Sequence, residues 1–388
     1  MGKMNNGVIT ARQFKIIIIF SLIGDTILIL PNVVGNLSKQ DAWISMLIAV
    51  VGGMLVGGLF AGLIRRMAGH SLISTTIGIT GRLAGGIIGL ALIAAFYITI
   101  LTLIIELSLF MTTQMMPETP SQAIVLSFLI VTTVGMRYGV ESFARMSELL
   151  FPIFIAMFLF LTVCLLPQID FHRLAPVASS GFGPILQGGY PAFAFAFLET
   201  ATLLMLVPNL KGDQQSITRA VRDGFLTGGI LLFIVVLVCI LVLGPTMMEI
   251  KYYPTFLLAQ RIEIGQFLER LEAFLTFLWI VTVFYKTLLY SFSIMKGLSE
   301  VFELKEERFI AMPLSLLLLA GSQINVPNVA TYAELLSIFP NYDMVFYLTI
   351  PLLLYLLLGI PAIKRRLERS SNSKNSGANV ESGKSSEG

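Results

Sequence analysis

The sequence predicts an all-α integral membrane protein with ten transmembrane helices and both termini in the cytoplasm. Of its 388 residues, 56% are hydrophobic and only 13% are charged, and the mean hydropathy is +0.84. Average soluble proteins are about 45–50% apolar and about 25% charged. Ten apolar segments have lengths close to or above the roughly 20 residues that a membrane span needs. Lys and Arg residues are distributed unevenly between the two ends of these segments, which sets the orientation.

No soluble domain interrupts the apolar segments, and the longest connections between them are 167–183 and 246–265. We expect a cytoplasmic N-terminus over 1–12 and a transmembrane domain over 13–366. The remainder, 367–388, is rich in Ser, Lys, Asn and Gly and is expected to be a disordered cytoplasmic tail, because it cannot bury a core. The predicted spans are 13–34, 42–64, 83–116, 121–140, 146–166, 184–208, 224–245, 266–299, 309–325 and 341–363.

The basic residues predict which side each connection faces. With a cytoplasmic N-terminus, 20 Lys and Arg residues fall on the cytoplasmic side and 5 on the outer side. Lys286 lies within a span and accounts for the remaining one of the 26. Because cytoplasmic loops of membrane proteins carry the excess of Lys and Arg, both termini are predicted to be inside.

Composition and motifs also exclude several classes of protein. The net charge of +3 is small and scattered, which argues against a nucleic-acid-binding surface. Cys164 and Cys239 lie inside apolar runs, as expected for buried thiols and not for a metal site or a disulfide framework. The sequence has no HExxH, Walker or CxxC motif. We therefore expect no enzyme activity, cofactor or metal.

The order of the spans predicts an inverted repeat. Ten spans with both ends inside divide into halves of five with opposite topology, a design common in secondary transporters. The halves are about 13–166 and about 184–363. The third span of each half is unusually long, at about 34 residues, or about 50 Å of helix. The first span of each half contains one deep acidic residue and ends in a proline.

These first spans are predicted to be broken helices. In the first half, Gly24, Asp25 and Thr26 interrupt an apolar run, and glycine lowers helix propensity. In the second half, Glu199 lies between apolar residues without a neighbouring glycine, so the signal there is weaker. Interrupted helices place free backbone groups at the membrane midplane, where they bind charged ligand groups. The alternative is helix packing with each polar side chain satisfied by a neighbouring helix.

Four ionisable residues are predicted to lie deep in the membrane: Asp25, Glu106, Glu199 and Lys286. Each costs at least about 2.5–3.5 kcal/mol at a helix centre, so each needs a partner or a function. We assign Asp25 and Glu199 to the ligand site. Lys286 has a functional and a structural interpretation. It is a tethered cation that either replaces a bound sodium ion or titrates with a partner carboxylate. Alternatively, its side chain extends to the membrane interface or forms a static ion pair. Glu106 is either a coupling residue or a structural hydrogen-bonding group.

Other pocket candidates follow from their depth in the first, third, sixth and eighth spans. Tyr97 and Leu101 share one face of the third span near its midpoint. Ordinary helix packing is the alternative for each apolar or small polar candidate. The predicted ligand-binding set is Gly24, Asp25, Thr26, Tyr97, Leu101, Phe195, Leu198, Glu199, Thr200 and Thr287.

Several of these motifs, in their order and spacing, resemble the B-subunit (GerAB-type) family of spore germinant receptors. They are Ile9-Thr-Ala-Arg-Gln-Phe, Gly24 to Pro31, Phe197-Leu-Glu199 with Pro208, and Glu269-Arg-Leu-Glu272 with Trp279 and Lys286. That family belongs to the amino acid–polyamine–organocation superfamily. The resemblance covers about residues 8 to 366, and its weight lies in the order of the motifs, since none is a strong fingerprint alone.

The resemblance implies a LeuT-like fold of ten helices with broken helices 1 and 6, located in the spore inner membrane. It also implies a complex with an A-type subunit and a lipoprotein C-type subunit. The family senses small nutrients such as amino acids and starts germination. Asp25 departs from the family, in which a small or hydroxylated residue is expected, and the tail after Arg369 is an extension without a functional implication.

Two functions remain open from the sequence. As a receptor, the protein would bind a nutrient in a mid-membrane pocket and signal to partner subunits through a change in conformation. As a transporter, it would carry an amino acid together with protons or cations. The fold permits both functions, and the resemblance favours the receptor.

Overall fold

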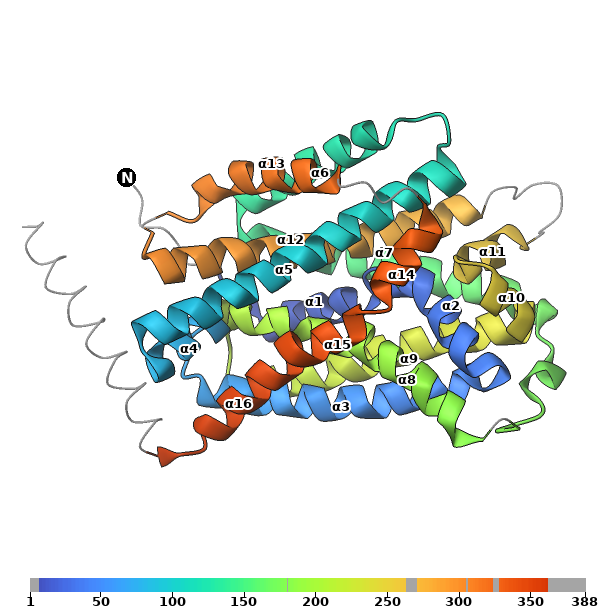
Figure 1. Ribbon diagram of the computed structural model, residues 1–388, viewed down its shortest axis with the longest axis horizontal. Helices are drawn as coiled ribbons and strands as arrows, with labels where there is room; N and C mark the ends of the chain where they lie inside the picture. The colour runs from blue at the N-terminus through green and yellow to red at the C-terminus, as the bar shows by residue number, and fades with distance from the viewer. Residues whose placement is uncertain (1–6, 180, 263–270, 305, 324–327, 362–388) are drawn as a thin grey trace, which may run out of the picture.

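A computed structural model describes residues 7–179, 181–262, 271–304, 306–323 and 328–361, which form a bundle of long helices (Figure 1). The described part of the first half of the chain contains α1 (Ala11–Ile23), α2 (Thr26–Ser38), α3 (Ala42–Arg66), α4 (Leu72–Thr80), α5 (Arg82–Phe110), α6 (Ser121–Tyr138) and α7 (Val140–Leu165). A π-helical turn, Met111–Met115, extends α5, and a short 3₁₀ turn, Lys39–Asp41, joins α2 to α3.

The second half begins with two 3₁₀ turns, Leu166–Gln168 and Phe171–Leu174. Its described helices are α8 (Phe182–Phe197), α9 (Gln214–Leu243), α10 (Pro245–Ile250), α11 (Pro254–Gln260), α12 (Glu272–Phe302), α13 (Ala311–Ser322), α14 (Val329–Leu336), α15 (Phe339–Asp343) and α16 (Ile350–Leu357). A 3₁₀ helix, Leu198–Asn209, continues α8, and a 3₁₀ turn, Arg308–Ile310, precedes α13. A π-helical turn, Met344–Thr349, joins α15 to α16.

Eight helical stretches in the described part of the chain are long and apolar enough to cross a membrane. They are Thr26–Arg66, Arg82–Met115, Ser121–Tyr138, Val140–Gln168, Phe182–Asn209, Gln214–Leu243, Glu272–Phe302 and Val329–Leu357. A shorter apolar stretch, Arg308–Ser322, contains α13. The stretch of 34 residues that contains α5 agrees with the long third span predicted at 83–116.

The predicted boundaries differ most near the end of the chain. The span predicted at 341–363 corresponds to a longer stretch that begins earlier, with α14 at Val329. The sequence between the predicted ninth and tenth spans contains Asn328, whose side chain caps α14 by accepting the amide hydrogen of Thr331. The predicted tail over 367–388 lies outside the described residues, as do residues 1–6 of the predicted N-terminal segment.

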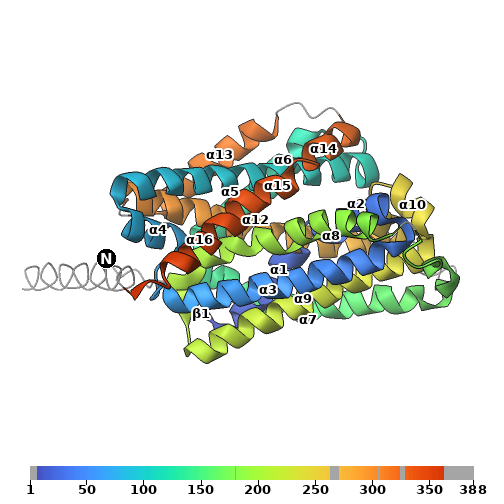
Figure 2. The same ribbon diagram turned by 60° about the horizontal axis from the view of Figure 1, so that its bottom comes forward.

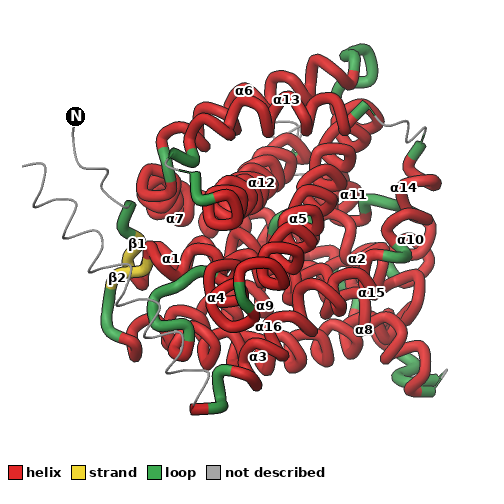
Figure 3. The backbone as a smooth tube through the Cα atoms, turned by 60° about the vertical axis from the view of Figure 1, so that its left-hand side comes forward, coloured by secondary structure: helices red, strands yellow, loops and turns green. Residues whose placement is uncertain are grey.

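The core of the bundle forms around α1, α2, α8 and α12. Helix α1 packs against α9 and α12, α2 packs against α8, and α3 covers α8 and α9. Helix α5 packs along α12 (Figure 2). Helices α6 and α13 lie side by side on one outer face of the bundle, and much of α6 remains exposed there (Figure 3). This arrangement buries two segments at the centre, the junction between α1 and α2 and the junction between α8 and the 3₁₀ helix Leu198–Asn209.

Two short parallel strands bring the start of α1 beside the segment that follows α8. Strand β1 (Ile9–Thr10) pairs with β2 (Leu210–Lys211), with Ile9 opposite Leu210. Thr10 also caps α1 in a capping box with Gln13, the third helical residue. Because α1 begins where the Leu198–Asn209 helix ends, these two segments enter the core from the same end of the bundle.

Candidate functional site

The first interruption lies between α1 and α2. Helix α1 ends at Ile23, and Gly24 has a φ of +24°, which favours glycine. The Thr26 hydroxyl lies 2.7 Å from both the Leu22 and Ile23 carbonyl oxygens. It therefore supplies a hydrogen-bond donor to carbonyls that have no partner within α1. Helix α12 supplies a further donor, the Thr282 hydroxyl, 2.8 Å from the Gly24 carbonyl oxygen. Polar side chains therefore satisfy the backbone where the helix stops.

The second interruption is a change of helix type. Helix α8 ends at Phe197, and the 3₁₀ helix that follows is 12 residues long, whereas runs beyond 3–4 residues are uncommon. The Thr200 hydroxyl donates to the Phe197 carbonyl oxygen at 2.5 Å. The Glu199 carbonyl accepts from the hydroxyls of Tyr290 and Thr202, each at 3.0 Å. Glu199 therefore lies in the first turn of an unusually long 3₁₀ helix, and α12 supplies a hydrogen bond to its backbone carbonyl through Tyr290.

Lys286 joins the two interruptions. Its ammonium nitrogen, Nζ, lies 2.5 Å from Asp25 Oδ1 and 2.5 Å from Glu199 Oε2. The side chain of Lys286 is fully buried, and those of Asp25 and Glu199 are nearly so. Lys286 Nζ donates a hydrogen bond to Asp25 Oδ1 and forms a close ion pair with Glu199 Oε2. We call these three residues the Lys286 triad.

Two carboxyl groups face one ammonium in the triad, so Lys286 can balance the negative charge of only one of them. Removing one partner of a buried ion pair costs about 3–5 kcal/mol, since it leaves an uncompensated charge. The pairing agrees with two interpretations of Lys286, the titrating tethered cation and the static ion pair, and which of them holds stays a prediction. Its nitrogen contacts two carboxylates that are far apart in sequence, inside the bundle, and does not extend to a membrane surface.

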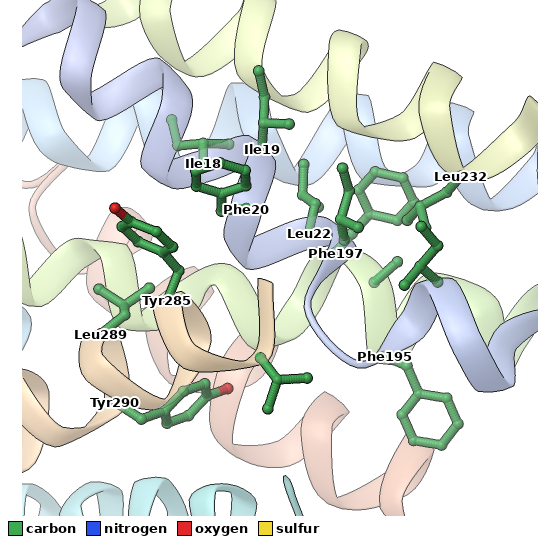
Figure 4. Close-up of a cluster of buried hydrophobic side chains, with 14 of the residues drawn as sticks. Ile18, Ile19, Phe20, Leu22, Phe195, Phe197, Leu232, Tyr285, Leu289 and Tyr290 are labelled. Carbon is green, nitrogen blue, oxygen red and sulfur yellow. The ribbon is translucent and has the colours of Figure 1, made fainter. Parts of the chain in front are cut away.

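Other predicted pocket residues line the core near the triad. Leu198, Thr200 and Thr287 are fully buried, and Phe195 is nearly so. The Thr287 hydroxyl, next to Lys286 in the sequence, has no hydrogen-bond partner. Phe195 and Phe197 point in different directions, with Phe197 near Leu232 (Figure 4). Whether any of these residues binds a ligand stays a prediction.

Tyr97 and Leu101 lie on another side of α5. The Tyr97 hydroxyl donates to the Leu317 carbonyl oxygen of α13 at 2.9 Å. A Cβ on Gly321 of α13 would lie 2.8 Å from that hydroxyl and 3.0 Å from Leu101 Cδ1. At about 100° per residue, this face is opposite that of Glu106. The structure does not bring these two residues to the triad, so their role in ligand binding stays a prediction.

Glu106 is buried in the core and takes part in a separate contact. The Tyr332 hydroxyl of α14 lies 3.3 Å from Glu106 Oε2 and 3.2 Å from the Thr102 carbonyl oxygen, so its one proton is shared between these acceptors, while Glu106 Oε1 has no partner. Whether Glu106 is a structural or a coupling residue stays a prediction. Tyr332 was not among the predicted site residues, because it lies in a segment predicted to connect two spans.

Another buried carboxyl group near the centre of the bundle was also missed. Asp343, at the end of α15, is fully buried, and neither of its carboxyl oxygens has a hydrogen-bond partner. Its charge would interact with those of Glu199, Lys286 and Asp25. The only sequence signal was an acidic residue near the start of a predicted span, where an acidic side chain is expected to reach water.

The structure also contains a half-open apolar cavity beside the first interruption. It is lined by α2, α7, α9, α11 and α12, and its empty space, including the open part, is about 440 Å³. The Thr255 hydroxyl in its wall donates to the Ile27 carbonyl oxygen at 2.7 Å. Lys286 does not line this cavity. Among the described residues, no group of three or more His, Cys, Asp and Glu side chains is arranged to hold a metal ion.

The sequence matches a known protein family over most of its length. Residues 8–330 match the sequence profile of a family described as spore germination protein. The chain belongs to the spore germination protein family. Three relatives from Bacillus subtilis (strain 168) are each 26% identical to it. Spore germination protein KB matches over 91% of this chain and 95% of its own length. Spore germination protein B2 matches over 90% and 95%, and YndE over 76% and 82%.

Solved structures show the fold of this spore germination protein. Mhp1, a nucleobase-cation-symport-1 family transporter solved in a closed conformation with bromovinylhydantoin bound, superimposes with a TM-score of 0.65 and 12% identity. The match covers 88% of this chain and 78% of Mhp1. MhsT in complex with L-phenylalanine gives a TM-score of 0.62 and 13% identity, over 92% and 96% of the two chains. The chain is therefore a multi-pass integral membrane protein with the fold of LeuT-like transporters.

Proposed function

We propose that this spore germination protein is the nutrient-sensing subunit of a germinant receptor. It binds a small molecule, such as an amino acid, in a mid-membrane pocket and signals to partner subunits. The observation that carries this proposal is the Lys286 triad. One side chain holds both interrupted segments through Asp25 and Glu199, so a ligand that competes for either carboxylate changes how the two segments are held together.

The proposed topology has ten transmembrane helices in two inverted repeats of five, with helices 1 and 6 broken and both termini in the cytoplasm. Helix 1 is α1 with α2, and helix 6 is α8 with the 3₁₀ helix Leu198–Asn209. The pairing of β1 with β2 supports the opposite direction of these two spans, since the start of one lies beside the end of the other. The excess of Lys and Arg in the predicted cytoplasmic loops supports the orientation.

The proposed ligand pocket lies between spans 1, 3, 6 and 8. An amino acid would place its ammonium against Asp25 or Glu199, and its carboxylate against free backbone N–H groups at the start of a half-helix. The unpartnered Thr287 hydroxyl would contact the ligand. Phe195, Leu198 and Thr200 would shape the side-chain pocket. The structure of MhsT with L-phenylalanine supports an amino acid as the ligand class, because the two proteins share a fold.

Signalling requires that the ligand bind two conformations with different affinities. Entry of an ammonium group next to Glu199 competes with Lys286 and releases one link between the interrupted segments. The bound conformation would then be read by an A-type subunit and a lipoprotein C-type subunit in the spore inner membrane. The names of the relatives, which are spore germination proteins, support this setting.

A second candidate function is proton- or cation-coupled transport of an amino acid. It is favoured by the structural similarity to Mhp1, whose family symports nucleobases with cations. The Lys286 ammonium would then be a tethered cation in the place of an exchangeable one. The two functions share the same pocket and differ in whether the substrate crosses the membrane.

Purified protein in proteoliposomes separates these functions. We would screen radiolabelled amino acids and nucleosides for equilibrium binding, and for uptake under a proton gradient. The receptor predicts saturable binding with no accumulation beyond the binding stoichiometry. Accumulation driven by the gradient would overturn the receptor in favour of the transporter. The Glu199→Gln variant should bind roughly 10- to 100-fold more weakly in either case, whereas Glu141→Gln, which removes a surface ion pair with Arg145, should bind as the wild type does.

A further inference from the structure

Asp343 lies at a change in helix geometry beside the Lys286 triad. It is the last residue of α15, and the π-helical turn Met344–Thr349 follows it directly. Helix α15 packs against α8, and the π-helical turn packs against the 3₁₀ helix that contains Glu199. The residue is 0% exposed. Its carboxyl group therefore lies among helices near the centre of the bundle, without contact with water.

Among the described residues, none donates a hydrogen bond to Asp343. Both of its carboxyl oxygens lack a hydrogen-bond partner. The nearby tyrosine hydroxyls are engaged elsewhere. Tyr290 donates to the Glu199 carbonyl at 3.0 Å, and Tyr342 donates to the Ala95 carbonyl at 2.6 Å. The Tyr347 hydroxyl bonds with that of Thr99 at 2.7 Å. An ionised carboxylate is therefore unsupported by hydrogen bonds in this environment.

The charged groups around Asp343 do not stabilise a negative charge there either. Lys286 is the one cation among the residues whose charges act on Asp343, and it lies 2.5 Å from both Asp25 and Glu199. A third carboxylate would give this cluster two excess negative charges. The titratable groups that interact electrostatically with Asp343 come from several elements. They are Asp25, Glu199 and Lys286, with Tyr190 from α8, Tyr290 from α12, and Tyr342 and Tyr347 from its own segment.

We propose that Asp343 is a proton-binding site, and that it carries its proton while Lys286 holds Asp25 and Glu199. Burying an ionised carboxylate without a partner is so costly that the group neutralises instead. The proton replaces the missing counter-ion, so the core retains an acid that can ionise if a positive charge enters beside it. This assignment depends only on the resting structure and not on the identity of the ligand.

Infrared difference spectroscopy tests the proposal directly. A protonated carboxylic acid has a C=O stretching band, separate from carboxylate bands, that moves to lower frequency in D₂O. At neutral pH, the spectrum of the purified wild type minus that of Asp343→Asn should contain this band. Asp41→Asn is the matched control. Asp41 is also buried, but its Oδ1 accepts the Ala178 amide hydrogen at 2.8 Å, so its substitution should not remove an acid band.

Absence of the band from the Asp343→Asn difference spectrum would overturn the proposal, because Asp343 would then be ionised. Asn is close in shape to a neutral Asp, so the variant should also unfold at the wild-type temperature. If the variant does not accumulate, wild-type protein labelled with carbon-13 at the aspartate carboxyl groups replaces it. An acid band that shifts with this label is then expected, and its absence at neutral pH would exclude a protonated Asp343.

Discussion

The side chain of Lys286 crosses the interruption between α1 and α2 directly over Gly24. A Cβ on Gly24 would lie 2.5 Å from Lys286 Cδ and 3.5 Å from Lys286 Cε, and real Cβ atoms essentially never come within 3.0 Å of another heavy atom. Gly24 therefore has two roles. It permits the positive φ at the end of α1, and it leaves room for Lys286 to reach Asp25 and Glu199.

Gly24→Ala should destabilise the protein and displace Lys286 from the triad. The strained backbone alone costs about 1–3 kcal/mol for a residue with a side chain, and the clash with Lys286 adds to it. The change is measured by thermal unfolding in detergent. Gly58→Ala is the control, because a Cβ there meets open space in the middle of α3. It should leave the unfolding temperature unchanged or raise it, and an equal loss in both variants would contradict the account of Gly24.

Substituting Lys286 tests whether the triad is an ion-pair network. Lys286→Met leaves Asp25 and Glu199 buried without their cation, and should destabilise the protein by about 3–5 kcal/mol. The triple variant Lys286→Met, Asp25→Asn, Glu199→Gln removes all three charges and should recover much of this stability. Unfolding of the three proteins in one detergent gives the comparison. A triple variant no more stable than Lys286→Met would show that the loss comes from packing and not from unpaired charge.

Thr282 is predicted to support the interruption from α12. Thr282→Val keeps the shape of the side chain but removes the donor to the Gly24 carbonyl, which lies 2.8 Å from the hydroxyl. Leaving that buried acceptor unpaired should cost about 1–3 kcal/mol. The control Thr276→Val lies on the same helix, and its hydroxyl bonds only within α12, to the Glu272 carbonyl. Similar unfolding temperatures for the two variants would exclude a supporting role for Thr282.

Asn32 is predicted to fasten α2 to the segment that contains α10 and α11. Its side-chain nitrogen donates to the carbonyls of Met248, Glu249 and Lys251 at 2.9–3.1 Å, around the end of α10. Asn32→Ala should therefore increase amide hydrogen exchange over 245–260. Gln40→Ala, which removes bonds to Ser179 and Pro176, should not change exchange there. Unaltered exchange over 245–260 in Asn32→Ala would show that other contacts hold the segment.

The sequence was sufficient to predict the positions of most spans and four buried ionisable residues of the core, Asp25, Glu106, Glu199 and Lys286. Asp25, Glu199 and Lys286 stood out because charged residues are rare and costly within apolar segments. The interruption near Gly24 was also predictable, because glycine and two short polar residues occur together in one apolar run. What the sequence could not supply was the pairing, since the three residues come from three spans and meet only in the folded bundle.

The remaining site residues depended on helix rotation and on connections. Tyr97 and Leu101 lie at a suitable depth, but the orientation of α5 places them against α13, and hydropathy does not define that orientation in a helix with apolar residues all round. Tyr332 was missed because α14 was assigned to a connection. Asp343 was missed because an acidic residue near the start of a span usually reaches water, whereas α15 begins before it and carries it into the core.

The central claim is that a nutrient is sensed at the Lys286 triad, and the most direct test is the germination dose–response of spores that carry Glu199→Gln. The substitution keeps the shape of the side chain and removes its charge. Loss of one charged contact with the ligand is worth about 1.5–3 kcal/mol, so the half-effective nutrient concentration should rise roughly 10- to 100-fold. The amount of protein in the membrane should stay at the wild-type level. A wild-type dose–response at equal protein abundance would contradict the claim and remove Glu199 from the site.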